Sequence, residues 1–288
     1  MPAITGTLRH PCGTVPVMAS QREKAEQFLS LHEPGRPLVM PNAWDEGSAK
    51  LFESIGFRAI ATTSSAFAAT RGRLDGDISR DEAVDHTAAM AAATDVPVSA
   101  DLENGFADDP EGAARTIELA LAAGAAGGSI EDSSRDPDAP IYDFDLAVAR
   151  VAAAATAAHQ GDASFVLTAR AENFLYGRVD LDDTIARLQA FEQAGADVVF
   201  APGWIELDHV KRIVDAVGVP VSVLVRPGGP TVGELASVGV ARISTGGALG
   251  FLALGAAGEA ARELLEHGTV GFLDQARTGA KQARDAFR

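Results

Sequence analysis

Two acidic residues at the end of one short apolar segment are the clearest chemical signal in this sequence. The segment V-P-V-S-A-D-L-E-N-G-F spans residues 96–106 and carries Asp101 and Glu103. Residues two positions apart share one face of a strand. If this strand belongs to a parallel barrel, both carboxylates lie at its C-terminal rim, where barrel enzymes build their active sites. Paired carboxylates at such a rim indicate a hard divalent cation.

Other polar residues follow further predicted strands. The sequence T-T-S-S at 62–65 offers hydroxyls and backbone donors for a carboxylate, although Ser and Thr are also common turn and capping residues. Arg170 ends V-L-T-A-R, and its planar guanidinium suits an anionic substrate, with an ion pair to Glu172 or Glu131 as the alternative. Asp75, in the glycine-containing loop R-G-R-L-D-G-D, is either an active-site acid or an exposed turn residue.

Glu131 ends the predicted strand that follows the Asp101 segment. We expect it beside Asp101 and Glu103, and the alternative for all three acids is that they are solvated loop residues or helix caps. Asp132 faces the opposite way if the strand continues, so it is assigned no direct role.

The elements that position these residues alternate between short β-branched runs and Ala-rich amphipathic segments. This alternation is typical of βαβ units around a parallel sheet. The predicted strands lie near 38–41, 59–63, 96–101, 127–131, 165–170, 197–201, 220–225 and 242–245. Eight strands predict an α/β fold of the (β/α)8 TIM-barrel type.

Residues 21–288 are predicted to form one barrel domain, preceded by a poorly ordered leader at 1–20. One helix is expected to start at Asp109 and Pro110 and to stop at Gly124. After the last strand, the chain supplies additional C-terminal helices. These helices either cap their own barrel or are exchanged with another subunit.

The composition excludes some classes of partner. Forty acidic against 24 basic residues give a net charge of −16, which opposes binding to nucleic acid or an anionic membrane. The single cysteine, Cys12, excludes an internal disulfide framework and fits a cytoplasmic protein. No apolar run is long enough to span a bilayer. The six histidines avoid the predicted strand ends, which makes a His-rich zinc site improbable.

Over roughly residues 22–270 the chain resembles the phosphoenolpyruvate mutase/isocitrate lyase superfamily. The resemblance depends on the joint order of six motifs and on their positions at strand ends. The motifs are P-N-A-W-D-E-G-S-A-K-L-F-E-S-I-G-F at 41–57, A-T-T-S-S at 61–65, G-R-L-D-G-D at 72–77, A-D-L-E-N-G-F at 100–106, I-E-D at 130–132 and A-R-A-E at 169–172.

The resemblance implies a Mg²⁺-dependent barrel, with Mn²⁺ as a substitute, that acts on 2-oxo or 2-hydroxy carboxylates through an enolate. It also implies a homodimer or homotetramer built by helix exchange. By motif position, Asp101 is the principal metal ligand, and Glu103 and Glu131 contribute through bound water. Metal ions of this kind keep several waters and use few protein carboxylates.

The same resemblance implies roles for the other candidates. Thr63, Ser64 and Ser65 are expected to hold the substrate carboxylate together with Arg170. Asp75 is expected to act in catalysis near the substrate. Trp44 is expected to form a wall or floor of the substrate pocket, with simple packing as the alternative.

One segment departs from the family pattern. Where isocitrate and methylisocitrate lyases carry a cysteine segment of the K-R-C-G-H type, this chain has S-S-R-D-P-D-A-P-I-Y-D-F at 133–144. The change argues against thiol-based isocitrate cleavage. It also removes the Lys and Asn of the gating segment that the phosphonate branch uses.

We therefore expect a carbon–carbon lyase or decarboxylase acting on a small 2-oxo or 2-hydroxy (di)carboxylate. A phosphonopyruvate-type mutase or hydrolase is the alternative, and a catalytically inactive metabolite-binding barrel is the alternative of another class. The proton donor stays open between Tyr142, Asp75 and an ordered water. Arg226, after the seventh strand, is a candidate to select a second carboxylate, with a surface ion pair as the alternative.

Overall fold

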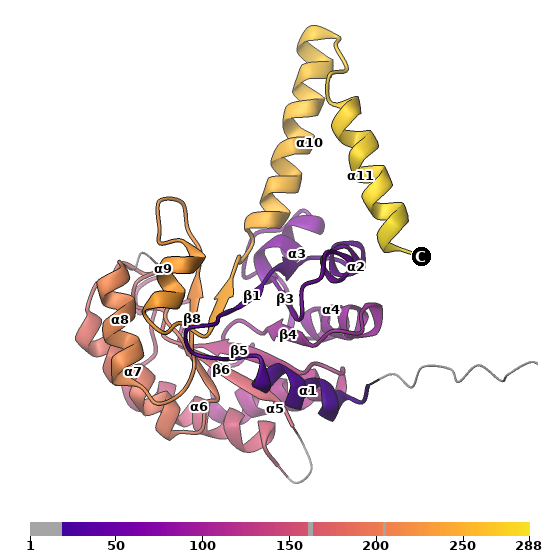
Figure 1. Ribbon diagram of the computed structural model, residues 1–288. Helices are drawn as coiled ribbons and strands as arrows, with labels where there is room; N and C mark the ends of the chain where they lie inside the picture. Colours follow the sequence, from indigo (N-terminus) through magenta and orange to yellow (C-terminus); the bar gives the residue numbers. More distant parts are fainter. Residues whose placement is uncertain (1–18, 161–163, 204–205) are drawn as a thin grey trace, which may run out of the picture.

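The computed structural model describes residues 19–160, 164–203 and 206–288. Nine parallel strands form one sheet in the order β1-β9-β8-β7-β6-β5-β4-β3-β2 (Figure 1). The predicted leader falls almost entirely outside the described residues, as does Cys12. The strands are β1 (Leu38–Met40), β2 (Asn42–Ala43), β3 (Ile60–Thr62), β4 (Val98–Asp101), β5 (Gly127–Glu131), β6 (Val166–Arg170), β7 (Val198–Phe200), β8 (Val221–Leu224) and β9 (Arg242–Ser244).

A proline explains why nine strands make an eight-stranded barrel. β1 pairs with β9 and β2 pairs with β3, so the two halves of one strand serve the two neighbours that close the sheet. Pro41 separates these halves, since it has no backbone N–H to donate to a ladder. Its carbonyl still accepts from the Ala61 N–H at 3.0 Å. All eight predicted strands are therefore confirmed.

Helices alternate with the strands along the whole barrel. They are α1 (Gln21–Ser30), α2 (Glu46–Ile55), α3 (Ser64–Thr70), α4 (Arg80–Ala93), α5 (Pro110–Ala122), α6 (Phe144–Ala158), α7 (Leu181–Gln193), α8 (Leu207–Ala216), α9 (Val232–Ser237), α10 (Ala248–His267) and α11 (Leu273–Ala286). The predicted start of α5 is confirmed, because the Asp109 side chain caps the helix and Pro110 occupies its first turn.

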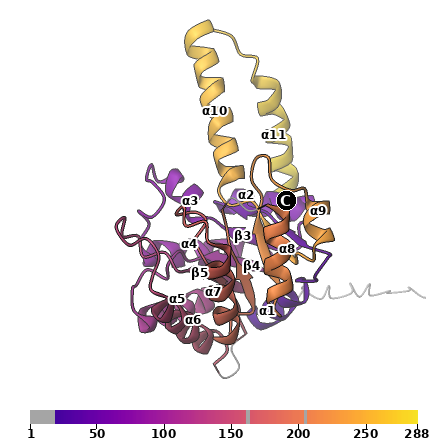
Figure 2. The ribbon, with the colours of Figure 1, turned by 90° about the vertical axis from the view of Figure 1, so that its left-hand side faces the viewer.

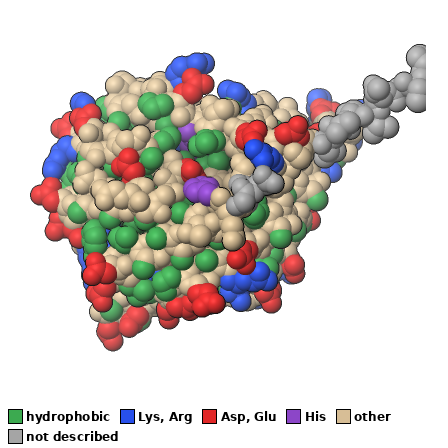
Figure 3. Space-filling view, turned by 90° about the horizontal axis from the view of Figure 1, so that it is seen from below, with side chains coloured by type: hydrophobic (Ala, Val, Ile, Leu, Met, Phe, Trp, Pro, Cys, Tyr) green, Lys and Arg blue, Asp and Glu red, His purple; other side chains and the backbone are tan. Residues whose placement is uncertain are grey.

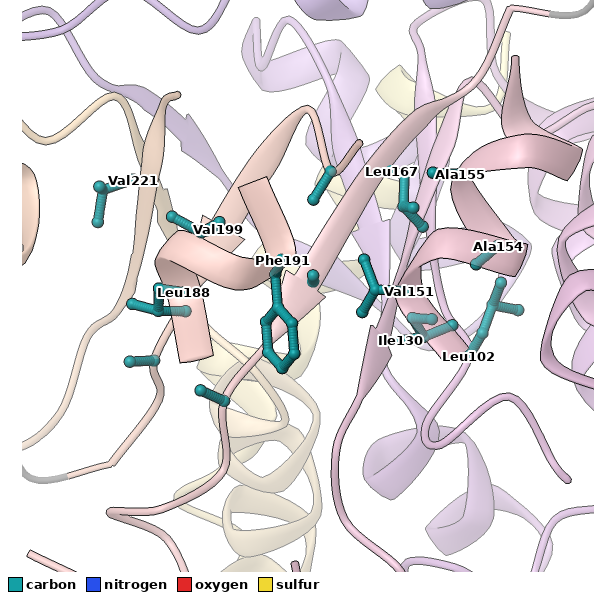
Figure 4. Packing of buried hydrophobic residues seen from close by; sticks show 14 of the residues in the cluster. Leu102, Ile130, Val151, Ala154, Ala155, Leu167, Leu188, Phe191, Val199 and Val221 are labelled. Atoms are coloured by element: carbon teal, nitrogen blue, oxygen red, sulfur yellow. The ribbon is translucent and has the colours of Figure 1, made fainter. Parts of the chain in front are cut away.

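The hydrophobic core lies between the outer face of the sheet and the surrounding helices. Figure 4 shows Ile130, Leu167 and Val199 of the strands packed against Val151 of α6 and Phe191 of α7. Because these strand residues point outward, the residues one position before and after them point into the barrel. The core therefore fixes which side chains can reach the barrel interior.

Helix α1 closes the N-terminal end of the barrel. Phe28 is fully buried and packs with Met40 and Val198, which point inward from their strands. A Cβ at Gly127 would lie 2.9 Å from the Phe28 ring and 2.6 Å from the Val166 carbonyl, so only glycine leaves room for this contact. On the face opposite the C-terminal hairpin, acidic and basic side chains crowd the edge (Figure 3).

The last two helices project from the barrel as a hairpin (Figures 1 and 2). Within α10 only Gly250 is buried, where a Cβ would lie 2.6 Å from Ala66. Phe287, just after α11, lies beside Gly47 of α2. The predicted C-terminal helical extension is thus confirmed, and most of α10 has no cover within its own chain. Among the described residues, no helix is long and apolar enough to cross a membrane.

Candidate active site

The inward-facing residues line a central cavity of about 740 Å³ at the C-terminal end of the barrel. Asp101, Glu131 and Arg170 end the adjacent strands β4, β5 and β6 and all line this cavity. The backbone pairs Asp101 with Ser129 and Glu131 with Arg170 across these strands. The three side chains come together because parallel strands end at the same edge and present every second residue inward.

Arg170 lies at the centre of a carboxylate cluster. Its Nη1 donates to Asp101 Oδ1 at 3.1 Å, its Nη2 lies 3.0 Å from Glu131 Oε2, and its Nε donates to Glu172 Oε1 at 2.8 Å. The ion pair that formed the alternative interpretation of Arg170 is therefore present. The guanidinium carries five N–H groups, so two of them stay available for a substrate anion.

The turn after β3 contacts this cluster through Ser64. Both the backbone N–H and the hydroxyl of Ser64 lie 3.0 Å from Asp101 Oδ2. The same hydroxyl lies 3.0 Å from Asp75 Oδ1, so the Asp75 loop reaches the metal-site candidate through one bridging serine. The Thr63 and Ser65 hydroxyls lie 3.2 Å apart, and both residues line the cavity.

Glu103 occupies an unusual position. Its backbone has φ of 49°, in the left-handed region that residues other than glycine rarely adopt. Its Oε2 pairs with Arg135 of the segment at 133–144, whereas its buried Oε1 has no hydrogen-bond partner among the described residues. An orphaned buried carboxylate oxygen is costly unless a further group binds it.

Negative charge is in excess at this end of the cavity. Burial raises the pKa of Glu131 well above its ordinary value, against the opposing effect of Arg170. Burial also raises the pKa of Glu172 and of Asp75, and the charge of Asp101 raises that of Asp75 further. Arg170 stays protonated, because its carboxylate neighbours outweigh the effect of its burial. A cation would relieve the repulsion among these acids.

The donor set fits Mg²⁺. The described residues include no group of three His, Cys, Asp or Glu side chains that already surrounds a metal position. Mg²⁺ does not require one, since it takes one or two carboxylates and keeps several waters. Asp101 is suited to direct contact, and the unsatisfied oxygen of Glu103 is suited to a bound water. The assignment of Asp101, Glu103 and Glu131 stays a prediction.

The structure corrects two expectations about aromatic residues. Trp44 is absent from the cavity lining, because its ring packs against Phe52 in an apolar cluster and against Gly250 of α10. Tyr142 also points away from the cavity, and its hydroxyl donates to Asp108 Oδ1 at 2.6 Å. Burial, followed by that hydrogen bond, raises the pKa of Tyr142 to about 12. Trp44 thus takes the packing position that was its alternative, and the Tyr142 hydroxyl is held by Asp108 outside the cavity.

Two charged residues also lie outside the central cavity. Arg226 lines a separate cavity of about 430 Å³. Asp132 points away as the strand alternation predicts: its carboxylate lies 3.0 Å from Arg187 and accepts from the Glu172 N–H at 2.8 Å.

Several cavity residues were not predicted. Asn42 Oδ1 accepts from the Thr245 and Gly246 backbone N–H groups, which ties the first strand to the end of β9. Tyr176 lines the cavity, and its hydroxyl lies 2.8 Å from Ser133 Oγ. Arg242 lines the cavity from the first position of β9. The strand register brings Asn42 and Arg242 to the cavity, whereas Tyr176 lies in the turn after β6, next to Gly177.

Comparisons with known proteins place this site in context. A family model described as phosphoenolpyruvate phosphomutase matches residues 28–265. The chain is 31% identical over 211 residues to an oxaloacetate decarboxylase of Paraburkholderia xenovorans, covering 70% of this chain and 67% of that protein.

Solved structures show the same similarity in three dimensions. A protein from Burkholderia cenocepacia J2315, provisionally assigned as a lyase/mutase, superposes with a TM-score of 0.87 at 49% identity, covering 92% of this chain and 95% of that chain. A 2,3-dimethylmalate lyase superposes with a TM-score of 0.80 at 27% identity, covering 91% and 94% of the two chains.

Proposed function

Because this chain belongs to the phosphoenolpyruvate mutase/isocitrate lyase superfamily, we propose that it is a Mg²⁺-dependent carbon–carbon lyase or decarboxylase. Its proposed substrate is a small 2-oxo or 2-hydroxy carboxylate, cleaved to leave an enolate. The similarity to an oxaloacetate decarboxylase and to a 2,3-dimethylmalate lyase supports this class of reaction.

The observation that carries the proposal is the cluster around Arg170. Asp101, Glu131 and Glu172 all contact its guanidinium, and Ser64 joins Asp101 to Asp75. Such an arrangement provides oxygen ligands, a cation for an anionic substrate and a carboxylic acid within one cavity. These are the groups that cleavage next to a carbonyl requires.

Mg²⁺ would be held directly by Asp101 and through water by Glu103 and Glu131. When bound, it supplies Lewis-acid polarisation of a substrate oxygen and stabilises developing enolate charge. The network among Ser64, Arg170 and Asp101 fixes the orientation of the Asp101 carboxylate before a ligand binds. That preorganisation lowers the cost of assembling the site.

The remaining groups would orient the substrate and move a proton. The two free N–H groups of Arg170 and the hydroxyls of Thr63 and Ser65 can bind the substrate carboxylate. Decarboxylation would release carbon dioxide, and cleavage of a 2-hydroxy acid would release a carbonyl fragment after the hydroxyl proton is lost to solvent. In both reactions the electron pair of the broken carbon–carbon bond stays on the other fragment as an enolate, which then takes up a proton at carbon. Asp75 is the proposed donor, because its raised pKa keeps more of the carboxyl protonated.

A product-resolved screen tests the proposal. The purified protein is incubated with 2-oxo, 2-hydroxy and phosphono carboxylates, with and without Mg²⁺. Carbon dioxide release indicates decarboxylation, and two carbon fragments indicate a lyase. Phosphate or phosphoenolpyruvate would instead support the phosphonate chemistry. The absence of any product, despite Mg²⁺ binding, would overturn the proposal in favour of a metabolite-binding barrel.

We also propose that the protein is a homo-oligomer whose subunits exchange their C-terminal hairpins. Support comes from α10, where Phe251, Leu252, Leu254 and Leu265 are each at least half exposed. Apolar side chains grouped on a projecting helix are typical of a surface that another chain covers. A second copy of this chain offers the same surface and satisfies two-fold symmetry.

A further inference from the structure

Arg170 and Glu172 reach the central cavity from two positions of one short turn after β6. Ala171, between them, packs into the core outside the sheet, and its N–H donates to the Phe200 carbonyl at 2.9 Å. The contact between the two side chains, 2.8 Å from Arg170 Nε to Glu172 Oε1, depends on the course of this backbone. The groups that hold the turn from outside the cavity therefore set the orientation of the Arg170 guanidinium.

Asp132, which follows β5, holds this turn at two points. Its backbone N–H donates to the Arg170 carbonyl at 3.2 Å, and its Oδ1 accepts from the Glu172 N–H at 2.8 Å. Asp132 is 3% exposed and does not line the central cavity. Its two hydrogen bonds bracket Ala171, so a change in the course of the turn on either side would break one of them.

Arg187 of helix α7 holds the second oxygen of the Asp132 carboxylate. Arg187 Nη1 lies 3.0 Å from Asp132 Oδ2 and donates to the Tyr142 carbonyl at 3.1 Å, while its Nε donates to Asp183 Oδ2 at 3.0 Å. Asp183 also accepts at 2.7 Å from Asn173, which follows the turn directly. A buried carboxylate is costly without such a partner, so Arg187 permits a charged acceptor behind the turn.

A carboxylate suits this position because two donors approach it from different sides. One oxygen accepts from the Glu172 N–H and the other from Arg187. An amide has a single acceptor oxygen, so asparagine would satisfy one donor and direct its own N–H groups at the other. Hydrogen bonds to an ionised acceptor are also about twice as strong as those between neutral groups.

We propose that Asp132 is a positioning residue, which together with Arg187 fixes the turn at 170–172 and thereby holds the Arg170 guanidinium in the orientation that binds the anionic substrate. This inference rests on the proposed function, because it assumes that Arg170 binds that anion. Strand alternation gave Asp132 no direct role, and the role inferred here is indirect. A misplacement of about 1 Å can lower the rate about 100-fold, so the orientation of Arg170 matters for turnover.

Oxalate, a small unreactive dianion, serves as the probe. Its affinity for the intact protein in Mg²⁺ is measured by calorimetry. Asp132→Ala should weaken oxalate binding about tenfold or more, because the turn can relax and move Arg170 away from the anion. Asp182→Ala removes an exposed carboxylate of α7 that pairs with Arg212, and it should bind oxalate as the wild type does.

A double-mutant cycle separates positioning from a general loss of stability. In the Arg170→Met background, Asp132→Ala should change oxalate affinity by about twofold or less, since the group that Asp132 positions is gone. Oxalate binding remains measurable there, because Mg²⁺ itself binds carboxylate oxygens. If Asp132 contributed only to stability, its removal would lower the free energy of unfolding and leave oxalate affinity unchanged.

A second set of variants provides the test if Asp132→Ala does not fold. Asp132→Asn combined with Arg187→Met removes both charges but keeps an acceptor for the Glu172 N–H. Because no buried charge is left unpaired, this double variant should bind oxalate within about threefold of the wild type. Asp132→Asn alone leaves the buried Arg187 without its partner and should bind oxalate more weakly than the double variant.

Equal oxalate affinity in the wild type and in Asp132→Ala would overturn the inference. It would also fail if Asp132→Ala weakened oxalate binding equally with and without Arg170. A wild type that does not bind oxalate would overturn both the inference and the anion-binding role of Arg170. If the two residues are coupled in oxalate binding but no substrate turns over, the inference stands and the proposed chemistry fails.

Discussion

At the residue scale, Asp101 is the most constrained acid of the site. Ser64 donates twice to one carboxylate oxygen and Arg170 donates to the other, while the Asp101 N–H donates to Thr62 Oγ1 at 2.8 Å. Such a carboxylate is held in one orientation by groups on β3, α3 and β6. A ligand position with this degree of support is more precise than one carried by a free loop.

Asp101→Asn should lower turnover by at least about 100-fold and weaken Mg²⁺ binding. The substitution keeps the shape of the side chain but removes its charge. The amide nitrogen of the new asparagine is a hydrogen-bond donor, and it replaces an oxygen that accepts from Ser64 or Arg170 in the wild type. Steady-state kinetics across a Mg²⁺ titration measure both effects. Asp95→Asn, at an exposed position before the same strand, should behave as the wild type. Full activity of Asp101→Asn would defeat the metal assignment.

At the element scale, α1 seals the barrel floor, and a buried histidine, His32, follows the end of this helix. His32 Nδ1 lies 2.8 Å from the Phe28 carbonyl, and its Nε2 has no partner among the described residues. Burial, and then the nearby charge of Arg242, lowers the pKa of His32 to about 3. The packing of this segment against the barrel therefore favours the neutral ring.

Acid should weaken the fold through His32. The pKa of His32 is about 3 in the folded chain and about 6.5 in the unfolded chain. Between pH 3 and pH 6.5, His32 is therefore protonated in the unfolded chain but not in the folded chain. The stabilising effect is complete above pH 6.5 and decreases as pH falls toward 3. Between pH 7 and pH 5 the loss should be about 2 kcal/mol. Urea unfolding across this range, compared with His32→Gln, measures it.

His159→Gln provides the matched control. The hydrogen bond that His159 donates to the Asp197 carboxylate raises the pKa of His159, so the stabilising effect of this pair is present below about pH 6.5 and is lost as pH rises through the folded-state pKa. His159→Gln should therefore change the pH dependence of the free energy of unfolding at and above neutral pH. If the free energy of unfolding falls equally steeply with pH below 6.5 in the wild type and in His32→Gln, the role of His32 is contradicted.

At the scale of the whole molecule, the hairpin of α10 and α11 projects beyond the barrel it follows (Figures 1 and 2). Leu265 is 87% exposed and Leu252 is 67% exposed, which is unusual for leucines on one helix. A second copy of the chain would bury this surface, and the hydrophobic effect would then favour the assembly.

Leu252→Glu combined with Leu265→Glu should shift the assembly toward monomers. The wild type is expected to run as a dimer or tetramer in light scattering coupled to gel filtration. Gln27→Glu combined with Gln193→Glu adds the same charge at exposed polar positions and should leave the assembly intact. A monomeric wild type, or an unchanged assembly in the leucine variant, would contradict the proposed exchange. Circular dichroism checks that the barrel stays folded.

The sequence by itself determined the alternating elements. Eight apolar runs predicted the barrel, and the end of the strand at Asp101 predicted a carboxylate at its rim. Strand alternation does not explain the position of Glu103, which lies in the turn after β4. These features are local, because strand periodicity and capping residues such as Asp109 act within a few positions of the chain. The break at Pro41 could not be anticipated, since it depends on which strands flank that residue in the closed sheet.

Only the tertiary structure decided which charges are neutralised. Arg170 contacts three carboxylates and Arg242 contacts none among the described residues, although both end up inside the barrel. The tertiary structure also decided that the Tyr142 hydroxyl contacts Asp108 and that Trp44 packs against Gly250 of α10. Electrostatic partners come from strands far apart in sequence, and their distances are fixed when the barrel closes. Local pattern can therefore place a side chain on a face, but closure determines what that side chain meets there.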